Sequence, residues 1–528
     1  MNTKKITRTG KIVFFAIVVL IAAAVVYFTG SYDYLKDSVF KSESTKISTN
    51  ATSNNGNNGS NDVIPTSDSN EINVSLDEWI GWKSVIDANG GLITKSGSIF
   101  DELGIKVNIH VMNDATQSSN AMIKGDLDAA GYTVNRYAFL YPKFKTSNTE
   151  VVMPFITNFS TGGDGIIAKA NINSVEDLVG KKIAVPRFSE AQTLVWWLLQ
   201  KSSLSQDQIA KIQKDMVMFD TPDEAAKAFF AGQVDAAATW QPYLSQAQET
   251  TGAKLLFSTK QANSIVLDGI VFNKKFYDAN KDTVAKFIEG TLNAVNLYTT
   301  EFTPIKDTMP LFATETNENI TAMAGDATLA TYNDNVKLLD DTAKTLFTDM
   351  SNIWKTIGEE SAANDVAKAF DSQVVKSLSD KFETTVVTPS VPKVTEQQRE
   401  TAKTQKNTQA LLKKSTTINF QANSAAFVDM TEAAKALDEF VGIAKILDGS
   451  IIQIEGNIAD TGVGDSESGR KLSEQRAKAV AMYLQQQGVD PTRFVIVGNG
   501  ITKQTGDNKT EEGKKQNRRT DIFFKIVE

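Results

Sequence analysis

One six-residue stretch limits the folds open to this chain. It is the glycine-rich elbow of residues 160–165, with the sequence Ser-Thr-Gly-Gly-Asp-Gly. An apolar run, 151–156, precedes it, and another, 166–168, follows it. Glycines adopt backbone conformations that other residues avoid and let other groups approach the main chain closely. The elbow therefore predicts two strands that meet at a polar turn. A plain glycine-rich turn without a binding role is the alternative interpretation of these residues alone.

The same short pattern stands on each side of the elbow, at residues 125–130 (Gly-Asp-Leu-Asp-Ala-Ala) and 232–237 (Gly-Gln-Val-Asp-Ala-Ala). Each glycine follows a helical-looking run and suits a helix C-terminal cap. The small apolar residues after each aspartate suit a buried strand. The repeat predicts two α/β lobes of like construction with the elbow between them. Strand ends that meet in two such lobes form a cleft, the usual place for a small ligand.

Length and composition narrow the classes of function. A chain of 528 residues predicts two or three domains. The net charge of −8 argues against a general nucleic-acid binder. The absence of cysteine from the sequence excludes disulfides, thiolate metal sites and a cysteine nucleophile. The single histidine, His110, lies on the polar face of an alternating run, so we interpret it as an ordinary surface or edge residue of a strand.

The N-terminal residues predict a membrane anchor. Residues 1–11 form a basic tail without acidic residues, and an apolar run begins at residue 12. We predict a transmembrane helix over 12–30, with the N-terminus in the cytoplasm and the rest of the chain outside. A cleaved signal peptide is the alternative, although the run ends without the small residues that a cleavage site needs. Residues 31–70, rich in Ser, Asn and Gly, predict a flexible linker.

Residues 71–385 have an α/β pattern that we assign to one two-lobed unit. The run 72–76 alternates like a strand and is followed by two aromatic residues, Trp79 and Trp82. After a second predicted strand, 181–185, Ser189 and Gln192 have the spacing of a capped helix start, and Arg187 stands beside it. Free N–H donors at a helix start attract anions. This is a candidate anion site, and a well-capped structural helix is the alternative.

Three segments in order, 158–169, 174–185 and 232–242, resemble the solute-binding proteins of ABC importers, in the branch for nitrate, sulfonates and thiamine-precursor pyrimidines. The resemblance extends from about residue 70 to residue 385. It implies an α/β, two-lobed type II periplasmic-binding fold, with lobes joined by crossing strands. It does not fix the ligand.

For such a receptor we predict ligand contacts at the strand ends of both lobes. Asp268 is a candidate because an acid at the end of a returning strand takes a ligand amine or ring nitrogen. The predicted ligand-binding residues are Trp79, Trp82, Thr161, Gly162, Arg187, Ser189, Thr239, Trp240 and Asp268.

A second linker, 386–414, precedes a small C-terminal domain, 415–528. We predict strands at 417–420, 450–455, 493–497 and 520–527, and helices at 430–447 and 470–487, an α+β unit of βαβαββ order. The segments 454–456, 472–477 and 517–519 resemble the OmpA-like peptidoglycan-binding domain. In that family an aspartate and an arginine grip the diaminopimelate of the peptide stem. Arg476 matches the arginine.

The aspartate of the OmpA-like pattern has no direct match. Ala459 stands where the family has aspartate, and Asp460 follows one residue later. The chain is also longer than the family spacing between Gly456 and Leu472. We predict that Asp460 moves into place through this insertion and pairs with Arg476 as the peptidoglycan site. An altered site is the alternative.

These features favour a membrane-tethered, extracytoplasmic receptor that captures a small anionic or heterocyclic solute by lobe closure. Its predicted partners are an ABC permease, peptidoglycan and the cytoplasmic membrane. A ligand-responsive sensor, or a wall-anchoring structural protein without a transport role, is the alternative. An enzyme is disfavoured because the sequence has no phosphate-binding Walker loop, no Gly-x-Ser-x-Gly motif and no metal-ligand cluster. We predict no cofactor.

Overall fold

The computed structural model describes residues 70–358, 365–382, 410–460 and 464–525, together with 395, 397, 399, 400 and 462. The predicted anchor over 12–30 lies outside these residues, as does the predicted linker up to residue 69. In the residues that are described, no helix has the length and apolar character needed to cross a membrane.

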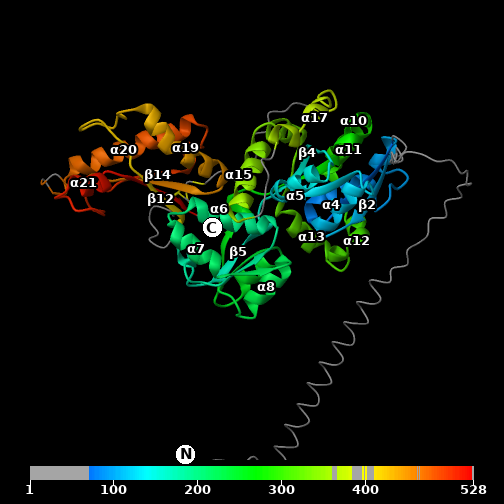
Figure 1. Ribbon diagram of the computed structural model, residues 1–528, viewed down its shortest axis with the longest axis horizontal. Coiled ribbons are helices and arrows are strands. Elements are labelled where there is room, and N and C mark those ends of the chain that lie inside the picture. Colours follow the sequence, from blue (N-terminus) through cyan, green and yellow to red (C-terminus); the bar gives the residue numbers. More distant parts are fainter. Residues whose placement is uncertain are drawn as a thin grey trace, which may run out of the picture. The chain divides into compact units, whose positions relative to one another are not determined.

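The first lobe is built on a six-stranded sheet of order β11-β4-β10-β3-β1-β2 (Figure 1). Its strands are β1 (Glu71–Leu76), β2 (Lys106–Val111), β3 (Ala129–Thr133), β4 (Val151–Ser160), β10 (Leu267–Asn273) and β11 (Ala327–Leu329). Strand β1 pairs in parallel with β2 and β3, whereas β10 runs antiparallel between β3 and β4. His110 lies on β2 and is exposed, as predicted.

The second lobe is built on a five-stranded sheet of order β7-β6-β8-β5-β9. Its strands are β5 (Asp164–Lys169), β6 (Ile183–Pro186), β7 (Met216–Phe219), β8 (Ala236–Trp240) and β9 (Ala253–Ser258). Strand β6 pairs in parallel with β7 and β8, whereas β5 runs antiparallel between β8 and β9.

The two sheets therefore share one topology. The order β2-β1-β3-β10-β4 in the first lobe matches β7-β6-β8-β5-β9 in the second, and in each the antiparallel strand is supplied by a chain crossing from the other lobe. The repeated glycine pattern marks equivalent places. Gly125 and Gly232 both have positive φ, at 83° and 73°, and stand shortly before β3 and β8. The predicted pair of like α/β lobes is confirmed.

Helices cover both sheets. The first lobe carries α2 (Lys83–Asn89), α3 (Ile99–Glu102), α4 (Ala115–Lys124) and α5 (Val134–Thr146), after the 3-10 turn η1 (Ile80–Trp82). The second carries η2 (Val175–Leu178), α6 (Glu190–Lys201), α7 (Gln206–Lys214), α8 (Pro222–Phe230), α9 (Tyr243–Glu249) and η3 (Thr259–Gln261). After β10 follow α10 (Lys274–Ala279), α11 (Lys281–Asn293), η4 (Ala294–Leu297), α12 (Thr303–Thr308), η5 (Pro310–Phe312), α13 (Asn317–Ala324), α14 (Tyr332–Leu338), α15 (Thr342–Thr356), α16 (Val366–Ala369) and α17 (Gln373–Lys376).

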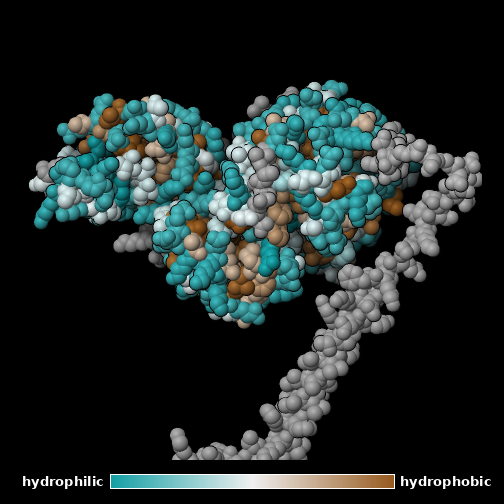
Figure 2. Space-filling model, in the orientation of Figure 1, coloured by the Kyte–Doolittle hydropathy of each residue, from teal (hydrophilic) through white to brown (hydrophobic). Residues whose placement is uncertain are grey.

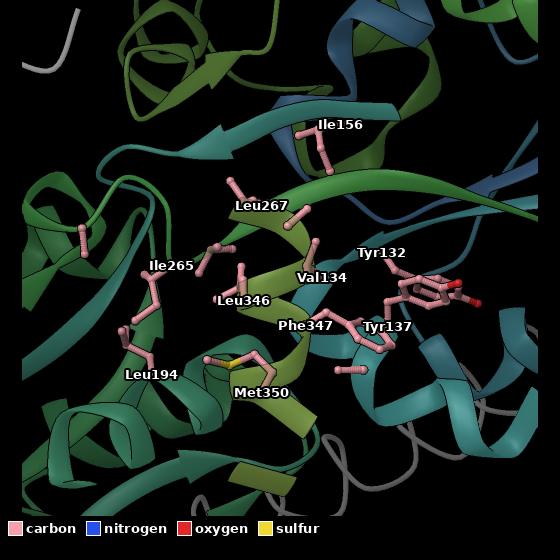
Figure 3. Close-up of a cluster of buried hydrophobic side chains, with 14 of the residues drawn as sticks. Tyr132, Val134, Tyr137, Ile156, Leu194, Ile265, Leu267, Leu346, Phe347 and Met350 are labelled. Carbon is pink, nitrogen blue, oxygen red and sulfur yellow. The ribbon is translucent and has the colours of Figure 1, made fainter. Parts of the chain in front are cut away.

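Helix α15 connects the lobes because it packs on α5 of the first and on α6 of the second. Figure 3 shows Phe347 of α15 against Tyr137 of α5, and Met350 of the same helix facing Leu194 of α6. All four side chains are buried. The burial of such side chains is worth roughly 1.5–3 kcal/mol each, so this contact stabilises the lobes in the arrangement seen.

The C-terminal domain has a four-stranded sheet of order β12-β15-β13-β14. Its elements are β12 (Ala410–Thr416), α19 (Met430–Ile446), β13 (Ile451–Gly456), α20 (Glu467–Gln486), η6 (Pro491–Arg493), β14 (Phe494–Gly498), α21 (Glu511–Asn517) and β15 (Thr520–Lys525). Helices α19 and α20 and three of the strands agree with the prediction.

Two details of the predicted βαβαββ order are wrong. The first strand is β12 (Ala410–Thr416), within the segment predicted to be a linker, whereas 417–420 makes only an isolated bridge from Phe420 to Phe427. Strand β12 has no clear alternation of apolar and polar residues, because Leu411 and Leu412 are adjacent and are its two buried residues. A polar run also precedes it, so the sequence does not indicate a strand there. The helix α21 is polar and short, which explains why periodicity does not reveal it.

Hydrophilic residues cover most of the visible face of the molecule, with hydrophobic residues scattered among them and a group of these beside α8 (Figure 2). Isolated apolar residues on a surface are ordinary. The surface therefore does not indicate a binding site, and the polar groups at the strand ends are the better candidates for one.

Candidate functional sites

The elbow is one of two crossings between the lobes. Strand β4 ends at Ser160 in the first sheet, and β5 begins at Asp164 in the second. The chain returns through Thr259, whose hydroxyl lies 2.7 Å from the Ser160 hydroxyl and accepts a hydrogen bond of 3.0 Å from the Gly162 amide. A Cβ on Gly163 would lie 2.3 Å from the Trp79 ring, so the close approach predicted for the elbow is present.

Four carboxylates surround the crossings, two from each lobe. Asp77 directly follows β1, and Asp268 stands near the start of β10 opposite Thr133, the last residue of β3. In the second lobe Asp164 starts β5 opposite Trp240, the last residue of β8. Asp268 and Asp164 thus occupy corresponding places in the two lobes. The fourth carboxylate is Glu190, the first residue of α6.

One cation lies among these acids. Arg136, in the first turn of α5, donates to Glu190 Oε2 at 3.0 Å and lies 3.7 Å from Asp77 Oδ2. It therefore joins the first lobe to the second. We call Asp77, Arg136, Asp164, Glu190 and Asp268 the carboxylate cluster. With every group ionised, four negative charges face one positive charge.

The carboxylate cluster is short of positive charge. Asp164 and Asp268 are only 5% and 3% exposed. Burial, and after it the charge of Glu190, raises the pKa of Asp164 to about 7, against a hydrogen bond from the Ser160 hydroxyl that lowers it. Burial raises the pKa of Asp268 well above its ordinary value, and three neighbouring carboxylates raise it further. Among the described residues, none donates a hydrogen bond to the Asp268 carboxylate.

Two tryptophans border the carboxylate cluster. Trp82 Nε1 donates to Asp77 Oδ1 at 2.5 Å, and the ring is 1% exposed. Trp79 Nε1 donates to Asn158 Oδ1 at 3.0 Å, and Asn158 pairs with Asp268 across β4 and β10. Burial raises the pKa of Asp77, although the charge of Arg136 opposes the rise. Within the described chain, no group of three or more histidine or acidic side chains has the arrangement of a metal site.

A second polar site lies in the C-terminal domain. A cavity of about 160 Å³ is lined by Thr417, Ile418, Asn419, Phe420, Gly456, Asn457, Arg476, Lys515, Arg518, Arg519 and Thr520. We call it the basic pocket, because four of these side chains are cationic and none is acidic. The guanidinium of Arg476 stacks over Phe420 at 4.9 Å and donates through Nε to the Ser424 carbonyl at 3.0 Å.

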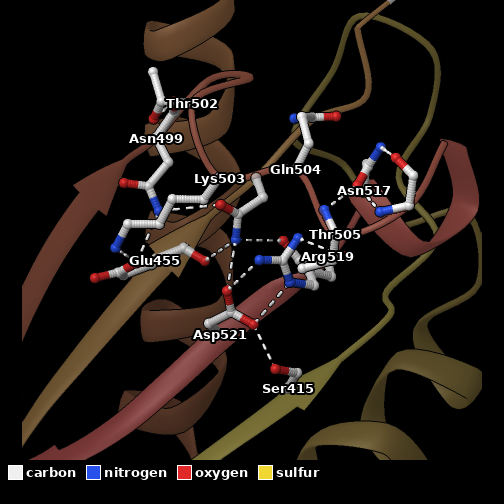
Figure 4. Close-up of polar contacts among 12 residues, drawn as sticks. Ser415, Glu455, Asn499, Thr502, Lys503, Gln504, Thr505, Asn517, Arg519 and Asp521 are labelled. Carbon is white, nitrogen blue, oxygen red and sulfur yellow. Dashed lines mark hydrogen bonds and ion pairs between the residues drawn. The ribbon is translucent and has the colours of Figure 1, made fainter. Parts of the chain in front are cut away.

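The basic pocket is supported by a buried polar network (Figure 4). Arg519 makes two bonds of 3.0 Å to the two carboxylate oxygens of Asp521. Asn457 donates to the same carboxylate at 3.0 Å. Asn517 is fully buried and its side chain accepts from the amides of Thr505 and Gly506, which fixes the chain just before the two arginines.

Residues 90–301 match the NMT1/THI5 like family, and residues 419–518 match the OmpA family. The chain joins an NMT1/THI5-like domain to an OmpA domain.

Curated relatives are similar to each of the two domains. A putative aliphatic sulfonates-binding protein of Bacillus subtilis (strain 168) is 34% identical over 134 residues, 25% of this chain and 39% of the relative. An outer membrane protein A of Bordetella avium is 36% identical over 91 residues, 17% of this chain and 46% of the relative. The chain thus spans less than half the length of either relative.

A solved structure is similar to the lobes. The periplasmic aliphatic sulphonate binding protein SsuA of Escherichia coli is 15% identical, with a TM-score of 0.46, and the similarity covers 58% of this chain and 99% of that protein.

In the NMT1/THI5-like domain the structure brings only some predicted residues to the carboxylate cluster. Asp268 belongs to it, and Trp79 and Trp82 border it. Their role as ligand contacts stays a prediction. Four members, Asp77, Arg136, Asp164 and Glu190, were not predicted. Asp164 lies inside the elbow, and its position directly before a strand could have indicated a role at the site. Arg136 and Glu190 lie in the first turns of helices, and no feature of the sequence indicates that either side chain itself takes part in binding.

The remaining predicted contacts of the NMT1/THI5-like domain make structural bonds. Thr161 bonds the Thr328 hydroxyl at 3.1 Å. Thr239 is fully buried and donates to the Pro222 carbonyl at 3.0 Å. Trp240 Nε1 donates to Asp223 Oδ1 at 3.1 Å. Gly162 contributes its amide to the crossing.

The predicted anion site is not assembled. Ser189 caps α6 as predicted, accepting from the Gln192 amide at 3.2 Å, while the Gln192 side chain accepts from the Phe188 amide. Arg187 is exposed and lines a separate surface depression with Asp220 and Lys227. The first residue of the helix is Glu190, a carboxylate held by Arg136, so the helix start faces negative charge.

In the OmpA domain Arg476 lines the basic pocket, whereas Asp460 is not among the lining residues. The Asp460 carboxylate instead accepts hydrogen bonds from the amides of Gly462 at 2.8 Å and Gly464 at 3.3 Å. Both bonds go to Asp460 Oδ1, while Arg476 donates to the carbonyls of Ser424 and Gln421. The structure leaves the basic pocket with arginines and no acidic lining residue.

Proposed function

We propose that this chain is an extracytoplasmic receptor that captures a small solute between its two lobes for an ABC importer and holds peptidoglycan through its OmpA domain. The observation that carries the first part is the convergence of the strand ends of two like sheets at the chain crossings. Ligands of open α/β sheets bind at such strand ends. The similarity to the putative aliphatic sulfonates-binding protein of Bacillus subtilis supports a small-solute role.

Capture follows from the crossings. Two short segments of the described chain join the sheets, and the lobes are able to open about them and close on a solute, with α15 and the Arg136–Glu190 pair holding the closed form. The Ser160–Thr259 contact holds the segments side by side during such a motion. A solute that touches both lobes binds the closed form more tightly and shifts the population toward it.

The receptor role is tested by thermal unfolding of the full chain with nitrate, ethanesulfonate, phosphate, pyrimidines and small amines. A receptor predicts a rise of the melting temperature with at least one solute, because binding to the native state stabilises it. Arg476→Ala, in the other domain, is the control and should leave that rise unchanged. The absence of a rise with every solute at millimolar concentration would contradict the proposal.

The peptidoglycan role rests on the OmpA family match and on the position of Arg476 in the basic pocket. An arginine forms a two-pronged bond with a carboxylate, and the peptide stems of peptidoglycan carry carboxylates. Arg476→Ala should abolish sedimentation of the full chain with purified peptidoglycan. Arg470→Ala removes an exposed arginine of the same helix, paired with Asp465 outside the pocket, and should sediment as the unchanged chain does. Equal sedimentation of all three proteins would contradict the wall site.

We also propose that residues 12–30 anchor the chain in the cytoplasmic membrane, with both domains outside. The apolar run and its basic flank support this orientation. Extraction of membranes at alkaline pH should leave the chain in the membrane fraction. Release into the supernatant would show that the segment is cleaved or does not insert.

A further inference from the structure

The carboxylate cluster holds more acidic side chains than the described residues pair with cations. Arg136 is within ion-pair distance of Glu190 and Asp77. Neither Asp164 nor Asp268 has an ion-pair partner among the described residues, although both are at least 95% buried. Isolated buried charges are costly and are normally paired. The described residues therefore supply no cationic partner for these two aspartates, and a ligand could supply one.

The lack of a partner for the Asp268 side chain is a separate observation. Its side chain is almost fully buried and accepts no hydrogen bond from the described residues. In the sheet it stands opposite Thr133, the last residue of β3, and opposite Asn158, which binds Trp79. Its main-chain carbonyl accepts a hydrogen bond from the Thr157 hydroxyl at 3.1 Å. A buried carboxylate that accepts no hydrogen bond from the protein is suited to accept one from the N–H groups of a ligand.

We infer that the solute of this receptor is an organic cation with N–H donors, an ammonium, amidinium or guanidinium group, held between Asp164 and Asp268. The inference rests on the proposed receptor function and names its substrate class. It differs from the anionic solute expected from the helix start at Ser189, where the structure places Glu190.

The division of the acids between the lobes gives the cation a second effect. Asp77 and Asp268 belong to the first lobe, and Asp164 and Glu190 to the second. Without a cation the repulsion between these acids opposes closure of the lobes wherever they are ionised, and Asp164 and Asp268 relieve it only by taking up protons. A cation between Asp164 and Asp268 turns this repulsion into attraction to a shared partner. The solute thereby favours the closed form through charge as well as contact.

The surroundings favour an organic cation over a metal ion. No metal-binding arrangement of acidic or histidine side chains exists among the described residues. Trp79, which is partly buried, borders the acids, and aromatic rings attract organic cations. Burial also excludes the water that a small inorganic ion keeps.

The test uses thermal unfolding of the full chain at pH 8 with putrescine and agmatine as cations and with ethanesulfonate and nitrate as anions. A cation should raise the melting temperature, and neither anion should do so. Asp268→Asn keeps the shape of the side chain and removes its charge. This variant should melt at a higher temperature than the unchanged chain without ligand and should bind the cation at least tenfold more weakly.

Asp349→Asn is the matched control, because Asp349 is a partly buried carboxylate of α15 outside the carboxylate cluster. It should keep the response to the cation. A rise with an anion and none with a cation overturns the inference and leaves the receptor function standing. No rise with any of the solutes counts against both. A cation response that survives unchanged in Asp268→Asn overturns the placement at Asp268.

Discussion

The two polar sites of this molecule are opposite in charge and in how that charge is balanced. The carboxylate cluster has four acids around one arginine, buried where the lobes cross. The basic pocket has four cations in its lining and no acid, but Asp521 neutralises Arg519 from behind. Lys515 and Arg518 of the basic pocket are exposed to solvent, whereas Asp164 and Asp268 are buried without an ion-pair partner among the described residues. This difference is the reason for proposing a ligand at the buried acids, whose raised pKa values otherwise favour the protonated form.

Removal of Arg136 should have the largest effect, since it is the one cation within ion-pair distance of the acids among the described residues. In Arg136→Met the four acids remain together without a cation, three of them buried and Asp77 partly exposed. Breaking a buried pair costs about 3–5 kcal/mol. Denaturant unfolding at pH 8 should show a loss of this order, with much of it recovered at pH 5, where the acids take up protons. Arg187→Met, an exposed neighbour, should change little. Equal stability of the two variants at pH 8 would contradict the role of Arg136 in neutralising the carboxylate cluster.

The pH dependence of the ligand-free chain should follow Asp164. Its pKa rises from 3.8 to about 7 on folding, so the native state binds more protons than the unfolded state between these values. Its contribution to stability is therefore complete below about pH 4 and is lost as the pH rises through about 7. In denaturant unfolding at pH 5 and pH 8, Asp164→Asn should lose less stability between the two than the unchanged chain. The opposite ordering would mean that Asp164 is paired in the native state.

Salt concentration should affect binding at the two sites differently, with a smaller effect than the substitutions above. The Debye length falls from about 10 Å at 0.1 M salt to about 3 Å at 1 M, and exposed charges are screened far more than buried ones. Sedimentation with peptidoglycan should weaken several-fold over this range, since Lys515 and Arg518 line an open pocket. The affinity for agmatine, measured by thermal shift, should change less. A larger salt effect on agmatine would place the cation outside the buried acids.

Much of the fold was predictable because its signals are local. The alternation of 72–76 and the glycine caps at 125 and 232 identify strands and helix ends without tertiary information. The elbow was predicted because glycines let other groups approach the main chain closely, and the structure places the Trp79 ring against Gly163. Segment β12 escaped prediction because its partner, β15, lies more than a hundred residues away and provides the pairing that its own sequence does not announce.

The candidate site was predictable only in part. Asp268 was predicted as an acid at the end of a returning strand, whereas the structure places it near the start of β10, at the crossings. Arg136 and Glu190 look like ordinary first-turn residues of capped helices, and only the tertiary fold shows that they meet at 3.0 Å. The misplacement of Asp460 has a similar cause. Its loop folds back on the amides of Gly462 and Gly464, a local choice that a family pattern does not reveal.

The most direct test of the buried acids is proton release on binding, measured by titration calorimetry of the full chain with agmatine at pH 7 in buffers of different ionisation enthalpy. Agmatine keeps its charge at this pH, whereas Asp164 is partly protonated because its pKa is about 7. A cation seated between Asp164 and Asp268 displaces these protons. The account predicts release of protons at pH 7 that is reduced in Asp164→Asn. Binding without proton release, or binding of ethanesulfonate in its place, would contradict it.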